Sequence, residues 1–518
     1  MLKIGATNFR KFQKLEAQEI RPITFLVGRN NSGKSTLVKA IMLVNDYLNS
    51  NKLDRFSFVS SILNETNIVS FGRAKNKSVT DSNSISFEVV IDEFEIEIVV
   101  SGNEDDTTVK VLDLIVKDTL RGFLFELDYR MNAFGYATAN VSAFQVKGKD
   151  KLLNQSLISV IDQEINRVQL AIRNINSTKI SREYIELTAR LNSLKEKRAL
   201  FIENNEKSDS PSDEASAVEV VFGKTELSID TSGQSLKDLA DLMKDDVESG
   251  YESVRGKEVT AEADDETTAF YLSYKNAYDH RNQWAMSFRK FATLLSKRAF
   301  HFIGATSMKQ NSLLSIKDSA NPLAVAVHNY FQKKLHKNSE FNSFVLKWMR
   351  LFEIGDDFTI EIHEGEAYSI KVKSDDYLVP IADKGMGSIQ AFIIILKIAY
   401  LGYQNEENLT TTILVEEPEL NLHPALQSLL ADLFLDAYEK FKLEFVIETH
   451  SEYMIRNTQL IVKQKEFEKK GNDNPFAVIY FDKDSKQWRM NYREDGKFAE
   501  DFGKGFYSEA ARLTIDLL

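Results

Sequence analysis

Short apolar runs alternate with helix-like patterns along much of this chain. Residues 23–27 are apolar apart from one threonine, which is typical of a strand buried on both faces. Apolar residues then recur every three or four positions across 37–48, which predicts a helix. Residues 413–415 are another short apolar run, and residues 443–447 are apolar apart from Glu444. The pattern predicts an α/β fold with parallel strands at its centre.

Residues 85–100 indicate a different kind of structure. Apolar and polar side chains alternate on either side of Asp92 and Glu93, as in an antiparallel hairpin with one buried face. A similar pattern continues over residues 112–129. Together with the strands expected in residues 2–27, these segments predict a β-rich lobe near the N-terminus.

The pattern changes again at about residue 151. Apolar residues across 161–175 and 184–194 are spaced alternately by three and four positions, which is the seam of a coiled coil. The frequent Lys and Arg residues of this region suit a solvated coiled-coil face better than a nucleic-acid interface, although binding stays open. Residues 298–303 then look like a strand that returns to the main sheet. We therefore divide the chain into an N-terminal part (1–150), an inserted arm with an acidic linker (151–297) and a C-terminal part (298–518).

The composition of the 518 residues limits the kinds of partner and site. The chain has no cysteine, which excludes disulfides and thiolate metal sites. Its formal net charge of −12 opposes nucleic acid, so that such a partner would need a local basic patch. We expect a cytoplasmic protein without a membrane span, because no apolar run approaches about 18 residues and the first residues lack the apolar region of a signal peptide.

The segment between the first apolar strand and its helix is Gly28-Arg-Asn-Asn-Ser-Gly33-Lys34-Ser35. It fits the phosphate-binding P-loop, in which the glycines let backbone N–H groups face inward. Lys34 would reach the β- and γ-phosphates, and the Ser35 hydroxyl would bind Mg²⁺. We therefore predict ATP and Mg²⁺ as cofactors. The residues expected to contact the nucleotide are Gly28, Asn30, Asn31, Ser32, Gly33, Lys34, Ser35 and Thr36.

A pair of acids follows the apolar strand at 413–415. A P-loop alone does not hydrolyse ATP, because the reaction also needs a carboxylate near the metal and a group that orients the attacking water. Glu416 and Glu417 stand at the C-terminal end of this strand, which is where ligands bind in open α/β sheets. We predict that Glu416 supports the metal, largely through water molecules, and that Glu417 is the general base or positions the water.

A histidine follows the next apolar strand, within Glu448-Thr449-His450-Ser451. A lone histidine at a strand end is usually structural. This one, however, lies after the strand that follows the Glu-Glu pair. We therefore predict that His450 senses the γ-phosphate and takes part in catalysis.

A second glycine-rich segment precedes the very apolar helix predicted over residues 389–401. Backbone N–H groups at a helix N-terminus can bind an anion. One chain has no use for two γ-phosphate sites on one ATP, whereas two facing chains can each close the site of the other. We therefore predict a homodimer or higher oligomer bridged by ATP. The residues expected to contact the partner's nucleotide are Lys384, Gly385, Gly387 and Ser388.

These motifs, in this order, resemble the ABC-type ATPase domain, and in particular the branch shared by RecF, SMC-type proteins and the OLD family. The resemblance implies an α/β fold of the ABC-type P-loop ATPase class with a β-rich N-terminal lobe and an inserted helical or coiled-coil arm. No Q-loop is assigned, because residues 70–76 lack a glutamine, and the signature segment departs from Leu-Ser-Gly-Gly-Gln. The matching positions are Asn8–Phe12 for the N-terminal signature, Gly28–Ser35 for Walker A, Lys384–Ser388 for the signature motif, Leu414–Glu417 for Walker B, Pro418–Leu422 for the D-loop and His450 for the switch histidine.

A closer resemblance is to the PtuA-like ATPases of Septu defence systems and related retron systems. Residues 447–456, 477–481 and 496–507 carry it, and it covers about residues 1–130 and 300–518. It implies an anti-phage role, an oligomer of ATPase dimers and a separate HNH nuclease partner. In the retron case it also implies a reverse transcriptase and its DNA as partners.

Two other functions stay open. A RecF-like repair protein would use the arm at 151–206 as a clamp on DNA, whereas a scaffold would bind ATP without turnover. OLD-type relatives append a TOPRIM nuclease, and Asp482 and Asp484 imitate its Asp-x-Asp pattern. Only residues 451–518 follow His450, which is too short for that fold. We therefore expect these two aspartates to lie in a hairpin turn.

Overall fold

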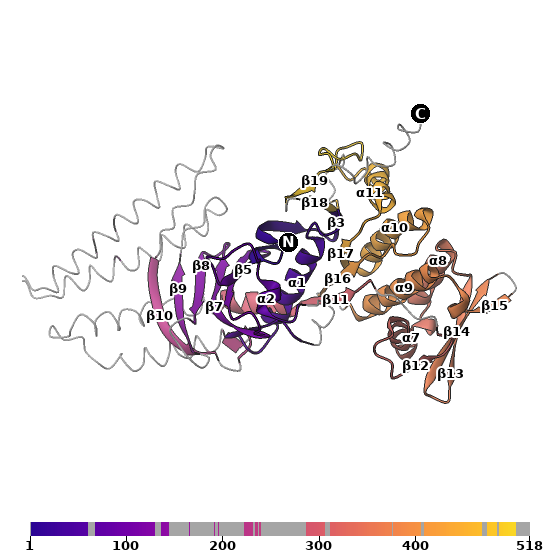
Figure 1. Cartoon of the computed structure of the whole chain (residues 1–518), viewed down its shortest axis with the longest axis horizontal. Coiled ribbons are helices and arrows are strands. Elements are labelled where there is room, and N and C mark those ends of the chain that lie inside the picture. Colours follow the sequence, from indigo (N-terminus) through magenta and orange to yellow (C-terminus); the bar gives the residue numbers. More distant parts are fainter. Residues whose placement is uncertain are drawn as a thin grey trace, which may run out of the picture. The chain divides into compact units, whose positions relative to one another are not determined.

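The computed structural model describes residues 2–60, 68–129, 136–143, 222–231, 286–305, 311–374, 377–405, 409–468, 474–483 and 486–503, with single positions between 165 and 239 (Figure 1). The chain forms two compact units. The first comprises Met1–Asp92, Ile96–Leu112 and Ala292–Leu518, and the second comprises Glu93–Glu95 and Asp113–Phe291.

The first unit contains a six-stranded sheet in the order β11-β16-β17-β3-β18-β19. The strands from β11 to β18 are parallel, and β19 pairs antiparallel with β18 at one edge. The apolar runs identified in the sequence become strands of this sheet, because central parallel strands are covered on both faces. The predicted α/β fold is therefore confirmed. The bounds are β3 Ile23–Gly28, β11 Arg298–Ile303, β16 Thr410–Glu416, β17 Glu444–Glu448, β18 Phe476–Phe481 and β19 Gln487–Met490.

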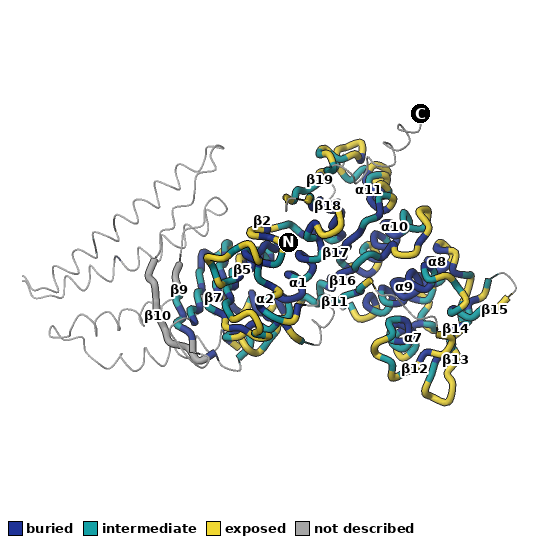
Figure 2. Tube along the Cα trace, viewed as in Figure 1, coloured by how far each residue is buried: buried dark blue, intermediate teal, exposed yellow. Residues whose placement is uncertain are grey.

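Helices follow the strands and pack among themselves. The helix α9 (Met386–Gln404) is buried over most of its length and packs against α7 and α8 (Figure 2). In the described part of the chain, α9 is long and apolar enough to cross a membrane by length and composition, but 67% of its apolar window is buried inside the protein. Its uniformly apolar sequence therefore reflects a position in the core. The other bounds are α1 Lys34–Leu48, α2 Phe71–Ala74, α7 Pro322–Gln332, α8 Ser339–Leu351, α10 Pro424–Phe441, α11 Glu452–Lys465, η3 Leu335–Lys337 and η4 Ile381–Asp383.

Antiparallel strands make up the predicted N-terminal lobe. β1 (Leu2–Phe9) lies between β2 (Phe12–Ile20) and β5 (Ser84–Ile91). The predicted hairpin is present, because β6 (Phe94–Ser101) is the neighbour of β5 in the sheet. β4 (Arg55–Ser57) pairs with the first residues of β7 (Thr108–Asp118).

A smaller sheet of the first unit contains β12 Leu314–Ser315, β13 Asp357–His363, β14 Ala367–Ser374 and β15 Tyr377–Pro380.

The second unit also contains antiparallel strands, two of which, β9 (Tyr136–Ala143) and β10 (Phe222–Asp230), were not predicted. β8 (Phe123–Asp128) pairs with β9, and β9 pairs with β10. β10 lies inside the segment expected to form a helical arm, so that this segment contributes a strand as well. The coiled-coil seams at 161–194 lie outside the described residues, apart from single helical positions. The predicted boundaries at residues 150 and 297 therefore stay predictions.

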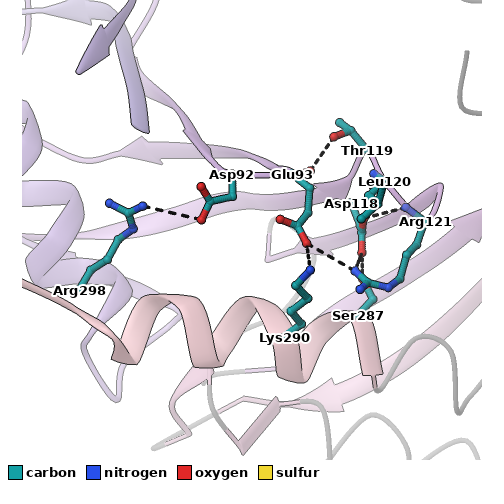
Figure 3. A network of polar contacts seen from close by, with 9 residues as sticks. All are labelled: Asp92, Glu93, Asp118, Thr119, Leu120, Arg121, Ser287, Lys290 and Arg298. Atoms are coloured by element: carbon teal, nitrogen blue, oxygen red, sulfur yellow. Dashed lines mark hydrogen bonds and ion pairs between the residues drawn. The ribbon is translucent and has the colours of Figure 1, made fainter. Parts of the chain in front are cut away.

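A buried carboxylate organises the turn after β7 in the second unit (Figure 3). Asp118 is fully buried, and its Oδ1 accepts the backbone N–H groups of Leu120 at 3.0 Å and Arg121 at 2.8 Å. The Arg121 guanidinium donates to Oδ2 at 2.9 Å, and the Ser287 hydroxyl also donates to Oδ2. Residues 286–296 are helical. The carboxylate thus joins the turn to this helix, which also packs Phe288 against Phe125.

Candidate nucleotide-binding site

The predicted P-loop connects β3 to α1 in the order strand, loop, helix. Gly33 is the N-cap of α1 and has a φ of 111°, which side chains other than glycine rarely adopt. A Cβ at this position would lie 2.3 Å from the Phe12 ring, so the loop packs closely onto that buried side chain. Asn31 adopts the left-handed conformation, and Asn30 and Asn31 are exposed. Gly28 ends β3, while Ser32 and Thr36 are buried.

The N-terminal hairpin of β1 and β2 packs against the P-loop. Phe12 begins β2 and is fully buried, and its ring lies 6.2 Å from that of Phe481. The Lys11 ammonium donates to the backbone carbonyl of Asn31 and, at 3.4 Å, to that of Lys483. The two aromatic residues of segment 8–12 are thus core residues, whereas Lys11 reaches the loop. Position 12 therefore acts on the site through packing.

The Lys34 ammonium is held inside the loop. Its Nζ donates to the carbonyl oxygens of Gly28 and Arg29, both at 3.1 Å, and lies 3.9 Å from Glu448 Oε1. Burial lowers the pKa of Lys34, and the negative charge of Glu448 opposes that shift. The lysine is therefore placed at the centre of the cradle with an acidic neighbour beside it.

Glu448 forms the contact with Ser35 that the sequence reasoning did not anticipate. The Ser35 hydroxyl donates to Glu448 Oε1 at 2.8 Å, across 413 positions of the sequence. Glu448 is the last residue of β17, and burial raises the pKa of its carboxyl group. Its second oxygen, Oε2, is buried without a hydrogen-bond partner among the described residues. The available signal was its position at a strand end, the same position that singled out Glu416.

The Glu416-Glu417 pair lies at the same edge of the sheet. Glu416 ends β16 and stands opposite Glu448 in the register between β16 and β17. Glu417 adopts a φ of 43°, and its N–H donates to the carbonyl of Glu448 at 2.8 Å. A left-handed conformation is uncommon for glutamate and recurs at functional sites. The turn places the Glu417 carboxylate beside His450.

His450 is positioned from two sides. Its Nε2 lies 3.7 Å from Glu417 Oε1, and its backbone N–H donates to Glu419 Oε1 at 2.6 Å. Burial, followed by the charge of Lys34, lowers the pKa of His450 to about 4. The imidazole is therefore neutral at pH 7 and can accept or donate one hydrogen bond. Glu419 is a further residue that the sequence reasoning missed; it is buried, and burial raises the pKa of its carboxyl group.

The second glycine-rich segment begins α9 and contacts the turn after β16. A Cβ at Gly387 would lie 2.3 Å from the carbonyl oxygen of Asn421, so these two backbones approach closely. Gly385 is exposed, with open space where a side chain would stand. Lys384 Nζ donates to Ser374 Oγ at 2.7 Å, and Ser388 is partly exposed in the first turn of α9. The segment thus presents an open glycine and a serine at a helix N-terminus.

The oxygen atoms at this edge fit a magnesium ion. Mg²⁺ takes oxygen ligands and keeps several waters, so it needs few protein ligands. Ser35 supplies a hydroxyl, and Glu416 and Glu448 supply carboxylates at adjacent strand ends. Glu448 Oε2, buried and without a partner in the described part of the chain, is the observation that points to a donor or cation that binds with the nucleotide.

Asp482 lies where the predicted hairpin turn places it. β18 and β19 pair antiparallel, and the Asp482 N–H donates to the Lys486 carbonyl at 2.8 Å where the chain reverses. Asp484 lies outside the described residues.

Comparison with known proteins gives one family match and several solved structures. A model of the AAA ATPase domain matches residues 1–455. An SMC head domain with an extended coiled coil from Pyrococcus furiosus, bound to the C-terminal domain of ScpA, has 13% identity and a TM-score of 0.36, covering 100% of both chains. An SMC head domain with a coiled coil and joint from Pyrococcus yayanosii has 12% identity and a TM-score of 0.37, covering 96% of this chain and 98% of that one. None of the curated proteins compared with this chain matches it.

Proposed function

Because this chain belongs to the AAA ATPase domain family, we propose that it is the ATP-hydrolysing subunit of a cytoplasmic anti-phage defence complex. In this proposal, ATP joins two copies and thereby controls a separate nuclease. That the chain is an ATPase follows from its family and its P-loop fold. We place it in the ABC-type branch with RecF, SMC-type and OLD proteins, most like the PtuA-like ATPases. The order of the motifs along the chain supports that placement.

The residues at the sheet edge can carry out hydrolysis in the following way. Lys34 and the loop N–H groups would bind the phosphates, and Ser35 and Glu416 would hold the metal. When bound, Mg²⁺ would neutralise charge that develops on the phosphates. Glu417 accepts the proton of the attacking water, and its backbone bond to Glu448 fixes the direction of its side chain. His450, neutral at pH 7, donates a hydrogen bond toward the γ-phosphate.

The exposed N-terminal tip of α9, with Gly385 and Ser388, is the observation on which the proposed dimer rests. Gly385 is exposed, no atom of the described residues lies within 4 Å of where its Cβ would stand, and Ser388 follows in the first turn of the helix. A glycine with open space lets a phosphate approach the backbone, and a helix N-terminus favours negative charge. The P-loop already serves the nucleotide of its own chain. We therefore infer that the tip serves the nucleotide of a second copy.

The nuclease partner rests on the sequence of the C-terminal part. Residues 447–456 and 477–481 resemble the PtuA-like ATPases, and the chain carries no His-Asn-His arrangement of its own. An HNH-type nuclease encoded nearby, with a reverse transcriptase in the retron case, would supply the cutting activity. The nucleotide state of the ATPase would then decide whether the nuclease acts.

Hydrolysis and dimerisation are tested together with three variants. Lys34→Ala should abolish ATP binding, because it removes the ammonium that reaches the phosphates. Glu417→Gln should retain ATP binding, lower turnover by roughly 10²–10⁴-fold by losing the general base, and hold the chain as a dimer. Glu494→Gln, an exposed position, is the matched control. Phosphate release gives the rate, and light scattering after size-exclusion chromatography gives the mass with and without ATP.

Three results would separate the candidate functions. Wild-type turnover by Glu417→Gln would refute the assignment of the base. A Glu417→Gln protein that stays monomeric in ATP would refute nucleotide-gated dimerisation. Strong duplex binding by the chain alone, weakening steeply with salt, would favour the RecF-like repair protein instead.

A further inference from the structure

The Glu448 carboxylate has no role in the mechanism above, yet it makes the direct contact with the Walker A serine. We propose that Glu448 is a positioning residue that orients the Ser35 hydroxyl toward the metal–nucleotide complex. The inference rests on the proposed ATP and Mg²⁺ site and adds a residue to it. Three observations carry it: the hydrogen bond, the strand order and the unpartnered oxygen.

The direction of the hydrogen bond prepares Ser35 as a ligand. A serine hydroxyl has one proton and two lone pairs. The proton is donated to Glu448 Oε1 at 2.8 Å, because a carboxylate in this position can only accept. Both lone pairs of the serine oxygen are thereby left for a cation. An outer carboxylate that orients a metal ligand in this way is a common feature of metal sites.

The strand order explains why Glu448 reaches Ser35. The P-loop leaves β3, and β17 lies directly beside β3, whereas β16 lies one strand further away. Neighbouring strands are about 4.8 Å apart. The last residue of β17 is therefore one strand from the P-loop strand, and Glu416, the last residue of β16, is two strands away. Glu416 can reach the metal through water, while Glu448 contacts the serine directly.

The second carboxylate oxygen supports a role toward a ligand. Glu448 Oε2 is buried and has no hydrogen-bond partner among the described residues. Buried acceptors are almost always satisfied in folded proteins, so an exception calls for an explanation. The Glu448 side chain is only 8% exposed, and its neighbours are Lys34 and Ser35. A donor that arrives with the nucleotide, such as a water on the metal, would satisfy this oxygen.

The test compares ATP affinity with and without magnesium. Isothermal titration calorimetry gives the Kd for ATP in Mg²⁺ and in EDTA, and the Kd in EDTA divided by the Kd in Mg²⁺ measures how well the site uses the metal. Glu448→Gln should lower this ratio by roughly 10–100-fold, the usual effect of losing an outer carboxylate. Affinity in EDTA should stay equal or rise, because a negative charge near the phosphates is gone. Glu444→Gln, at the other end of β17, should leave both affinities unchanged.

A double-mutant cycle shows whether Glu448 acts through Ser35. Ser35→Ala alone should lower the ratio, and adding Glu448→Gln should lower it no further, because both changes remove one interaction. Glu448→Asp keeps the charge but withdraws the carboxylate from Ser35, and it should also lower the ratio. This variant provides the same test if the glutamine variant does not fold.

The contrary outcomes are distinct from a failure of the proposed function. Glu448 would be merely structural if its variants kept the wild-type ratio, or if they weakened ATP binding equally in Mg²⁺ and EDTA. Independent, additive losses in the Ser35 cycle would also overturn the inference. Because the measurement needs only nucleotide binding by one chain, it holds whether or not ATP joins two copies or a nuclease associates.

Discussion

Replacing Gly33 by alanine is the most direct perturbation of the cradle. The φ of 111° lies where only glycine is comfortable, and forcing a side chain there costs about 1–3 kcal/mol. The new Cβ would also lie 2.3 Å and 2.5 Å from two atoms of the buried Phe12 ring. Relieving such overpacking costs about 1–3 kcal/mol more. We therefore expect a local cost of about 2–6 kcal/mol, against a total stability of about 5–15 kcal/mol for a typical protein.

The loss of local stability should appear first in the segments around Gly33 and Phe12. Hydrogen exchange followed by mass spectrometry should show faster exchange in residues 8–48, and calorimetry should show loss of ATP binding. Combining Phe12→Leu with Gly33→Ala should remove the part of the free-energy cost that comes from crowding. The part that comes from the φ of residue 33 should remain. Gly365→Ala, in the turn between β13 and β14, is the control: its φ of 74° brings similar strain, but no described atom lies within 4 Å of the added carbon, so ATP binding should be kept. If the Gly33→Ala variant showed wild-type hydrogen exchange and wild-type ATP binding, the inferred packing of the loop on Phe12 would be refuted.

Three further substitutions separate packing, chemistry and assembly. Gly387→Ala places a Cβ 2.3 Å from the Asn421 carbonyl oxygen. Light scattering should therefore show weaker ATP-dependent dimerisation, while calorimetry shows unchanged ATP affinity. Unchanged dimerisation would contradict the role of the α9 N-terminus in joining two copies. Asp118→Asn removes a buried charge that four donors satisfy. Urea unfolding should show that the free energy of unfolding of the second unit falls by about 3–5 kcal/mol. Asp105→Asn, at an exposed position, should leave this free energy unchanged. His450→Asn should lower the hydrolysis rate by roughly 10²–10³-fold, the usual effect of losing one transition-state donor, and an unchanged rate would exclude the role assigned to it.

The parallel sheet could be predicted because its strands carry a strong local signal. β3, β16 and β17 each contain a short apolar run, Ile-Thr-Phe-Leu-Val, Ile-Leu-Val and Phe-Val-Ile, since central parallel strands face helices on both sides. The polar residues that end β16 stand at the ligand-binding edge for the same reason of topology. β9 and β10 gave no comparable signal, because β9 is mostly small and polar residues, Tyr-Ala-Thr-Ala-Asn-Val-Ser-Ala. Their pairing depends on partners far away in the sequence, which a local pattern does not contain.

Glu448 was missed for a reason that also gives it its role. From the sequence alone, the acid before a histidine at a strand end is one more polar residue, and the order of strands in the sheet is unknown. Once β17 is placed between β16 and β3, the end of β17 faces the P-loop on one side and the Glu416-Glu417 turn on the other. This one strand end then contacts Ser35 through the Glu448 carboxylate, holds Glu417 through the Glu448 carbonyl and leads directly into His450. The proposed metal ligand, the proposed base and the proposed phosphate sensor are therefore all held by the same short strand, so that a shift of β17 would disturb all three together.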